Sequence, residues 1–474
     1  MKVLFVEPPK DYWFLMGEYL PPPYGILQLA AFLEDKVKDI EIEVLDCQAK
    51  HLDWSGLQKY MESFNPDIVA SSALATCNTY LAIRTFETAK KVNPNALTVA
   101  GGQHFTALAQ ESLEAYPEID VIVRGEGELT LADLVRAFGQ NSPFTKVDGI
   151  SFRKNGEILH NPSRPLIENL DDLPLPGYKF VDDVIKEYHF SVMAGPRTPY
   201  ALVEGSRGCP HHCTFCSQWR HWGGRFRAKS PKRIADEMEL CYRKFGCRFI
   251  WLTDDNLGLA ERAADLADEL VRRGISDDIM WFVQARCDDV VRRRDLLPKL
   301  RRSGLRWILL GAESNSASTL ESYNKGIGPE DIRGAVKLLK ENDIFAHTMF
   351  IIGNRNDTVE SISNLKGFVD DLDPDLAIFG ILTPFPGTET FETAKRNGWI
   401  EELNWSNYDM VHAIMPTETL SRREVQEELY GCYRSFYGSW SRRFKGLFST
   451  NGMTRRVYWY MALGGVMRQL KGLF

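Results

Sequence analysis

The sequence alternates twice between short apolar strands and amphipathic helices, and a proline-containing stretch separates the two blocks. In residues 1–140, five strand-like segments are separated by helical periods, beginning with KVLFVEPP and ending with DVIVRG. This alternation predicts a parallel sheet, because parallel strands need crossover connections, which are usually helices. We therefore expect a doubly wound, Rossmann-like α/β domain over 1–140.

The second block follows a connector, residues 141–200, which contains NPSRPLIENLDDLPLPGYKF. Its proline and glycine residues interrupt helical periodicity and mark a domain boundary. Residues 201–395 contain six strand-like segments with helices between them, which predicts a partial (β/α)6 barrel of the TIM type. Residues 396–474 are predicted to form a small helical C-terminal domain.

Charge is distributed unevenly. The net charge is −7, which gives nucleic-acid backbones no general attraction, so we expect no nucleic-acid partner. Residues 421–474 nevertheless carry ten Lys and Arg against three Asp and Glu, and they are rich in aromatic residues. A helical cap with its aromatics packed on the barrel would explain this composition, and so would a surface for an acidic or membrane-associated partner.

The N-terminus and the hydropathy pattern suggest where the protein acts. MKVLFVEPP has no basic segment or cleavage site before its apolar strand, and no window approaches eighteen uninterrupted apolar residues. We therefore expect a cytoplasmic protein without a membrane span, with its cysteines reduced.

Three of the nine cysteines, Cys209, Cys213 and Cys216, fall within the stretch GSRGCPHHCTFCSQW. Such thiolates could hold a structural zinc if His211 or His212 supplied a fourth ligand. They could instead hold a cubane iron–sulfur cluster and leave one iron open for a substrate. The position favours the cluster, because the loop follows the first strand of the barrel, at the mouth where such barrels carry out chemistry. The other six cysteines are predicted to be small buried hydrophobes: Cys47, Cys77, Cys241, Cys247, Cys287 and Cys432.

The pattern C-x3-C-x-aromatic-C, with Phe215 as the aromatic residue, resembles the signature of the radical S-adenosylmethionine superfamily. The resemblance implies a [4Fe-4S] cluster whose open iron binds S-adenosylmethionine (SAM). It also implies that an electron, delivered by an external flavodoxin or ferredoxin, cleaves SAM to a 5′-deoxyadenosyl radical.

The ends of the later barrel strands then become candidate SAM contacts, although each could also be a strand-end cap or part of a solvated loop. Together with the signature aromatic, the predicted SAM-binding residues are Phe215, Asp254, Asp255, Gln284, Arg286, Glu313, Ser314, Gly353 and Thr383.

A doubly wound domain ahead of such a barrel, with EPP, GGQH and VRGEGE at its strand ends, resembles the cobalamin-binding class of the superfamily. The branch that contains the anaerobic magnesium-protoporphyrin monomethyl ester cyclase is the most similar. The D-x-H-x-x-G loop that supplies an axial histidine to cobalt in methionine synthase is absent after the first strand, where EPPKDYWFLMG stands, and His104 is the nearest substitute. The predicted cobalamin-binding residues are Ser71, Ser72, Leu74, Gly101, Gly102, Gln103, His104, Gly125, Glu126 and Gly127.

The resemblance implies a cobalamin-dependent radical C-methyltransferase that abstracts a hydrogen atom from an unactivated carbon and methylates it from methylcobalamin. Similar enzymes methylate a glutamine of methyl-coenzyme M reductase, so a peptide or protein substrate is expected. The alternative is the tetrapyrrole ring cyclase itself. Residues 19–25 and 220–227 are candidate gating loops over the cofactors.

Overall fold

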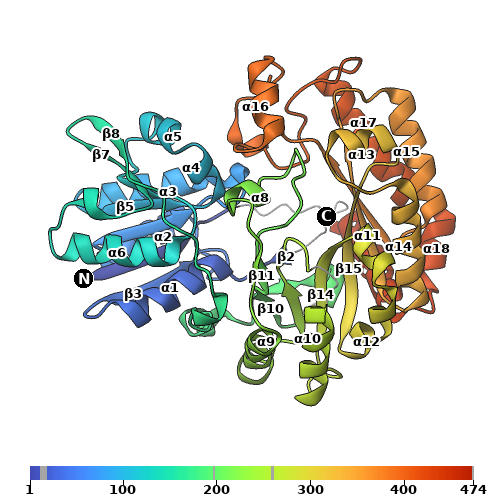
Figure 1. Ribbon diagram of the computed structural model, residues 1–474, viewed down its shortest axis with the longest axis horizontal. Coiled ribbons are helices and arrows are strands. Elements are labelled where there is room, and N and C mark those ends of the chain that lie inside the picture. Colours follow the sequence, from blue (N-terminus) through green and yellow to red (C-terminus); the bar gives the residue numbers. More distant parts are fainter. Residues whose placement is uncertain (11–18, 196–197, 258–260, 472–474) are drawn as a thin grey trace.

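Two large β-sheets lie side by side in the molecule, and each contains the strands of one alternating block of sequence (Figure 1). The computed structural model describes residues 1–10, 19–195, 198–257 and 261–471. The α/β class, the leading doubly wound domain and the partial barrel agree with the sequence prediction.

The N-terminal sheet has the strand order β3-β1-β4-β5-β6-β7-β8. Its parallel strands are β1 (Lys2–Glu7), β3 (Glu41–Asp46), β4 (Ile68–Ser72), β5 (Leu97–Gly101) and β6 (Val121–Val123). The connecting helices are α1 (Tyr24–Lys36), α2 (Trp54–Phe64), α3 (Thr79–Val92), α4 (Gln103–Ala107), α5 (Ala109–Ala115) and α6 (Gly127–Gly139). The order reverses between β1 and β4, and ligands of such sheets bind beyond the carboxyl ends of the strands at that point.

The sheet continues past residue 140, because the start of the connector forms a hairpin. Strands β7 (Ile150–Lys154) and β8 (Glu157–His160) add to β6 in antiparallel fashion. Asn155 and Gly156 form the turn, with φ of 54° and 86°. An Asn-Gly pair between two strands is the usual signal for such a turn, since both positions need positive φ.

The second sheet contains six parallel strands in the order β10-β13-β14-β15-β16-β17. Their bounds are Tyr200–Val203, Phe249–Leu252, Met280–Arg286, Leu305–Glu313, Phe345–Ile352 and Leu376–Ile381. The helices between them are α9 (Pro231–Phe245), α10 (Glu261–Arg272), α11 (Cys287–Arg292), α12 (Leu297–Arg302), α14 (Pro329–Glu341) and α15 (Val359–Leu372), with α16 (Glu389–Arg396) after the last strand.

The amino-terminal end of this barrel is filled by aromatic side chains. Phe249, Phe282, Trp307 and Phe345 are fully buried in one cluster, and the Trp307 and Phe345 rings stack with centroids 3.9 Å apart. Met453 and Val457 of helix α19 (Gly452–Lys471) pack into the same cluster. The barrel is therefore closed at this end.

Helix α17 (Arg422–Gly438) covers the outer edge of the sheet at β17. Its Tyr433 hydroxyl accepts a hydrogen bond from the Phe379 backbone N–H and donates one to the same residue's carbonyl oxygen. The Tyr437 hydroxyl donates to the carbonyl oxygen of Ala377 at 2.7 Å. These bonds satisfy backbone groups that an uncovered edge strand would expose. The aromatic residues of the C-terminal region thus pack on the barrel in part, as one of the two interpretations of its composition predicts.

Asp46, at the end of β3, gives a prediction for the pH dependence of stability. Burial and the Glu7 charge raise its pKa from 3.8 to about 6, although it accepts hydrogen bonds from two backbone N–H groups and from Tyr188. Between about pH 4 and pH 6 the folded state holds a proton that the unfolded state has released, so this residue's contribution to stability falls as the pH rises. Asp46→Asn is expected to raise the free energy of unfolding by about 1–3 kcal/mol above pH 6 and to flatten the profile. Denaturation across this pH range checks the result, with the exposed Asp35→Asn as control, and an unchanged profile for Asp46→Asn would contradict it.

Candidate functional site

The three clustered cysteines lie in one loop at the carboxyl end of β10, between β11 (Ser206–Arg207) and α8 (Gln218–His221). Gly208 opens the loop with φ of 86°, and a Cβ there would lie 2.1 Å from the Arg225 carbonyl oxygen, so only glycine fits. Within the loop, the Trp219 indole N–H and the Cys216 backbone N–H both donate to the carbonyl oxygen of Cys213. The loop is therefore folded tightly by its own backbone.

A second segment, residues 322–325, fastens this loop from the barrel side. It begins at the last residue of α13 (Ala317–Ser322). The Thr214 N–H donates to the Tyr323 carbonyl oxygen at 3.1 Å, and the Asn324 amide donates to the His212 carbonyl oxygen at 2.9 Å. The Phe215 ring meets the Tyr323 ring edge-on at 5.0 Å. The signature aromatic thus anchors the cysteine loop.

Of the three cysteines, Cys213 is buried, and Cys209 and Cys216 are partly exposed. Burial raises the pKa of Cys216 to about 12. Burial also raises the pKa of Cys213, against the opposing effect of the nearby Lys325 ammonium. A metal cation deprotonates such thiols on binding, so the set fits a cluster held by three thiolates. Within the described ranges, no three His, Cys, Asp or Glu side chains converge as ligands of a single metal ion.

Three buried charged side chains lie together beside this segment: Arg286 at the end of β14, Glu313 at the end of β15, and Lys325 of the segment itself. Lys325 forms a 2.7 Å ion pair with Glu313, and both side chains are less than one-tenth exposed. Arg286 donates to the Lys325 carbonyl oxygen at 2.6 Å. Glu313 has φ of 60° at a register shift in β15, a strained conformation of the kind that accumulates at functional sites. Lys325 was not among the predicted residues, because it lies twelve positions after Glu313 in a turn.

The two aspartates after β13 differ in what they can do. Asp254 is fully buried, and its oxygens accept from the Gly205 N–H at 2.7 Å and pair with Arg262 at 3.0 Å. It therefore shapes the start of the cysteine loop. Burial raises the pKa of Asp255 to about 7, and the charges of Asp254 and Glu204 add to this effect.

The remaining predicted SAM contacts also lie at the carboxyl edge of the barrel. Gln284 is half-buried near the end of β14. Ser314 accepts the Ser316 N–H in the turn after β15, and Thr383 donates to the Ile381 carbonyl oxygen. Gly353 has φ of 82° after β16. Their roles toward SAM stay predictions.

On the N-terminal sheet, the predicted cobalamin residues lie along one rim, because β4, β5 and β6 are parallel neighbours. Ser72 pairs with Gly101. Gly102 has φ of 93°, and a Cβ there would lie 2.8 Å from the Ala73 carbonyl oxygen. Ser71 donates to the Val6 carbonyl oxygen, whereas the side chain of Leu74 is about two-thirds exposed. Gly125 and Gly127 flank Glu126 in the turn after β6. Most of EPPKDYWFLMG lies outside the described residues.

His104 is buried at this rim, and its Nδ1 has no hydrogen-bond partner among the described residues. Its ring packs edge-on against Phe105 and against Trp405, at 5.4 and 5.0 Å. Trp405 comes from a short 3-10 helix, Trp405–Asn407, far along the chain. Burial lowers the pKa of His104 to about 4, so its imidazole is neutral.

Two contacts join the rim directly to the cysteine loop. Gln103 donates to the Gln218 side-chain oxygen at 2.7 Å and accepts from the Ser217 hydroxyl at 2.8 Å, one residue after Cys216. Glu126 pairs with Arg207 at 2.7 Å and with Arg227 at 2.8 Å, and all three side chains are about 5% exposed. Two predicted cobalamin residues therefore also hold the two domains together.

The predicted gating loops are only partly at the surface. Tyr19 of residues 19–25 is buried against Phe190 and Tyr200 in the barrel cluster. In residues 220–227, the ring centroid of Trp222 lies 5.6 Å from the guanidinium carbon of Arg207 and 5.6 Å from that of Arg227.

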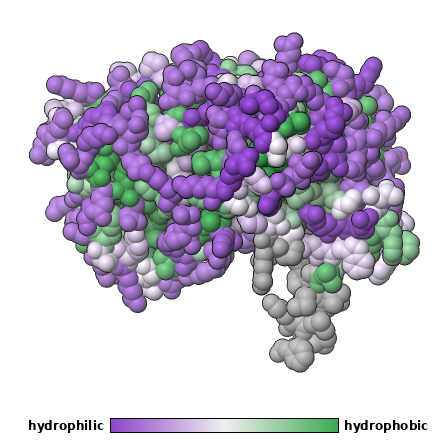
Figure 2. Space-filling model, turned by 90° about the horizontal axis from the view of Figure 1, so that it is seen from below, coloured by the Kyte–Doolittle hydropathy of each residue, from purple (hydrophilic) through white to green (hydrophobic). Residues whose placement is uncertain are grey.

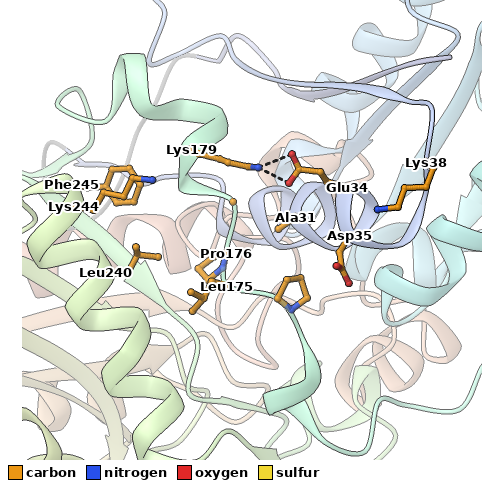
Figure 3. A pocket seen from close by; sticks show the side chains of 12 residues that line it. Ala31, Glu34, Asp35, Lys38, Leu175, Pro176, Lys179, Leu240, Lys244 and Phe245 are labelled. Carbon is orange, nitrogen blue, oxygen red and sulfur yellow. Dashed lines mark hydrogen bonds and ion pairs between the residues drawn. The ribbon is translucent and has the colours of Figure 1, made fainter.

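A hollow of about 480 Å³ lies elsewhere, between α1 and α9 (Figure 3). None of the predicted site residues lines it, and its Lys179 and Glu34 form an ion pair with one another.

The predicted buried cysteines behave as expected in five of six cases, and Cys77 is half-buried. No helix among the described residues has the length and apolarity to cross a bilayer.

Comparison with known proteins agrees with this geometry. Residues 17–135 match the B12 binding domain, and residues 203–369 match the radical SAM superfamily. The chain is 32% identical to an uncharacterized methyltransferase of Pyrococcus horikoshii over 92% of each chain. It is 33% identical to the anaerobic magnesium-protoporphyrin IX monomethyl ester cyclase of Cereibacter sphaeroides, over 92% of this chain and 70% of that one.

Among solved structures, the fold is similar to that of TsrM from Kitasatospora setae with cobalamin and a [4Fe-4S] cluster bound, with a TM-score of 0.72, 17% identity and 99% of each chain covered. It is also similar to OxsB with aqua-cobalamin and SAM bound, with a TM-score of 0.75 and 18% identity over 98% of this chain and 71% of that one. The two domains thus define a radical enzyme that combines a corrin with an iron–sulfur cluster. The chain belongs to the cobalamin-dependent radical SAM methyltransferases, and its cofactors are a [4Fe-4S] cluster, SAM and cobalamin.

Proposed function

We propose that the protein methylates an unactivated carbon of its substrate between the N-terminal rim and the barrel mouth. The observation that supports this proposal is the Gln103 bridge, because it brings the predicted cobalamin rim into direct contact with the residue that follows Cys216. When bound, the three cofactors supply a hydrogen-abstracting radical and a transferable methyl group.

Each of the three groups of predicted residues would hold one cofactor. Cys209, Cys213 and Cys216 would hold the cluster. Arg286, Glu313 and Asp255, with the other predicted barrel-edge residues, would hold SAM. The glycines of the N-terminal rim would let the corrin approach the backbone closely. The neutral, buried His104 would contact the edge of the corrin, and the buried walls would keep water from the radical.

For the substrate we propose a peptide or protein, as the resemblance to enzymes that methylate a glutamine of methyl-coenzyme M reductase implies. Because the chain is 33% identical to a ring cyclase, a tetrapyrrole substrate is the competing candidate.

The test begins with an anaerobic preparation assayed for iron, sulfide and corrin, and for 5′-deoxyadenosine formed from SAM with reduced flavodoxin or ferredoxin. Extracts of proteins and of small molecules are then incubated with SAM carrying a deuterated methyl group. Label on a carbon of a peptide supports the proposal. Label on a small molecule alone refutes the peptide substrate, and a product that gains oxygen or a ring without label refutes methylation.

The Gln103 bridge leads to a separate prediction. Gln103→Leu removes two hydrogen bonds at a half-buried site and is expected to cost only about 1–2 kcal/mol of stability. Because a misplacement of about 1 Å can cost about 100-fold in rate, methyl transfer is expected to fall by at least about tenfold while 5′-deoxyadenosine formation is retained. Gln110→Leu, whose glutamine contacts only surface groups, is the control. Equal losses of methyl transfer and of 5′-deoxyadenosine formation would contradict this role for Gln103.

A further inference from the structure

The last 46 residues, 429–474, contain eight Lys and Arg and no Asp or Glu. Only part of this region packs on the barrel. Helix α18 (Trp440–Leu447) and the residue after it present Trp440, Phe444 and Phe448 to solvent, with exposed fractions of 80%, 67% and 64%. Spacing of four residues places them along one face of the helix. Figure 2 shows apolar residues, in green, at the right-hand end of the molecule, where α18 lies in Figure 1.

Basic side chains accompany this aromatic stripe. Arg443 is exposed and lies 5.3 Å over the Trp440 ring. Arg455, near the start of α19, is also exposed, and one helical turn later Trp459 is about half exposed. Among the described residues, no carboxylate pairs with Arg443 or Arg455, whereas Arg442 and Lys445 pair with Asp373. The uncompensated charge of the surface is therefore positive.

We propose that α18 and the exposed side of α19 dock on an anionic lipid membrane and hold the enzyme at its surface. Exposed Trp and Phe flanked by Arg are the composition of helices that lie in the headgroup region. The charge complements anionic lipids, which attract each nearby basic side chain. A second copy of the chain fits less well, since a symmetric contact would bring arginines against arginines.

The test uses the complete reconstituted protein and vesicles of phosphatidylcholine, with and without phosphatidylglycerol. Co-sedimentation is expected only with the anionic vesicles and is expected to weaken at high salt. Arg443→Gln with Arg455→Gln is expected to reduce binding about fivefold for each charge removed. Trp440→Ser, Phe444→Ser and Phe448→Ser together are expected to reduce it by tenfold or more.

Two exposed residues elsewhere provide controls. Leu403 is 76% exposed and the Arg423 side chain 88% exposed, so Leu403→Ser and Arg423→Gln should bind vesicles like the parent chain. Unchanged cofactor content and melting temperature show that each variant folds. The proposal is overturned by the absence of binding, by equal loss in the controls, by binding that does not depend on anionic lipid, or by self-association that the aromatic variant abolishes.

Discussion

Arg207→Met is expected to lower the free energy of unfolding by about 3–5 kcal/mol. The guanidinium of Arg207 pairs with Glu126 at 2.7 Å, with Glu128 at 2.6 Å and with Glu204 at 3.0 Å. Methionine would leave these carboxylates buried with less cationic charge. Burial raises the pKa of Glu128, but Arg207 outweighs this effect and holds the pKa below its usual value, so the variant loses the cation that keeps this buried carboxylate charged.

The loss of unfolding free energy should be largest near neutral pH and smaller in acid, since protonation neutralises the carboxylates that have lost Arg207. Denaturant unfolding at several pH values measures it. Arg225→Met is the matched control, because its pair with Glu168 is more than half exposed on both sides and is worth less than about 1 kcal/mol. A similar small change in unfolding free energy in both variants would contradict a stabilising role for the buried ion pairs between the domains. Iron content should also fall in Arg207→Met, since Cys209 lies two residues away.

Lys325→Met is expected to weaken SAM binding by about 100-fold and stability by about 3 kcal/mol or more. The substitution removes the cation that pairs with the buried Glu313. It also perturbs the segment 322–325, which is hydrogen-bonded to the cysteine loop. Titration calorimetry of the reconstituted protein with SAM gives the affinity. Lys337→Met, which alters an exposed pair with Glu341, should change neither quantity.

A double variant separates structure from binding. Adding Glu313→Gln to Lys325→Met removes the uncompensated charge, so stability is expected to recover most of its loss. SAM affinity should not recover, because both polar groups are gone. Recovery of both would show that the pair only supports the fold.

The sequence permits prediction of the two sheets and the cysteine loop because their signals are local. Apolar periodicity identifies strands and helices, and three cysteines within eight positions identify a cluster loop. The hairpin at Asn155 and Gly156 also had a local signal, which the proline-rich context of the connector obscured. Glu126 and Gln103 were predicted at strand ends of the N-terminal sheet, where the structure has them, but their bonds to Arg207 and Ser217 were not predicted.

What could not be predicted depends on contacts between distant segments. Lys325 reaches Glu313 only because the turn after α13 folds back under the cysteine loop. Trp405 reaches His104 from 301 positions along the chain, and no spacing rule connects them. Asp254 is predicted to bind SAM, and its hydrogen bond from Gly205 and its ion pair with Arg262 could not be predicted, because they join separate segments of the barrel.

The aromatic closure of the barrel by Phe249, Phe282, Trp307 and Phe345, sealed by Met453 and Val457, has a consequence for turnover. Because these side chains fill this end, a molecule cannot pass through it along the barrel axis. Substrate must therefore reach the cysteine loop, and product must leave it, by routes on the side where the strands' carboxyl ends meet the N-terminal domain.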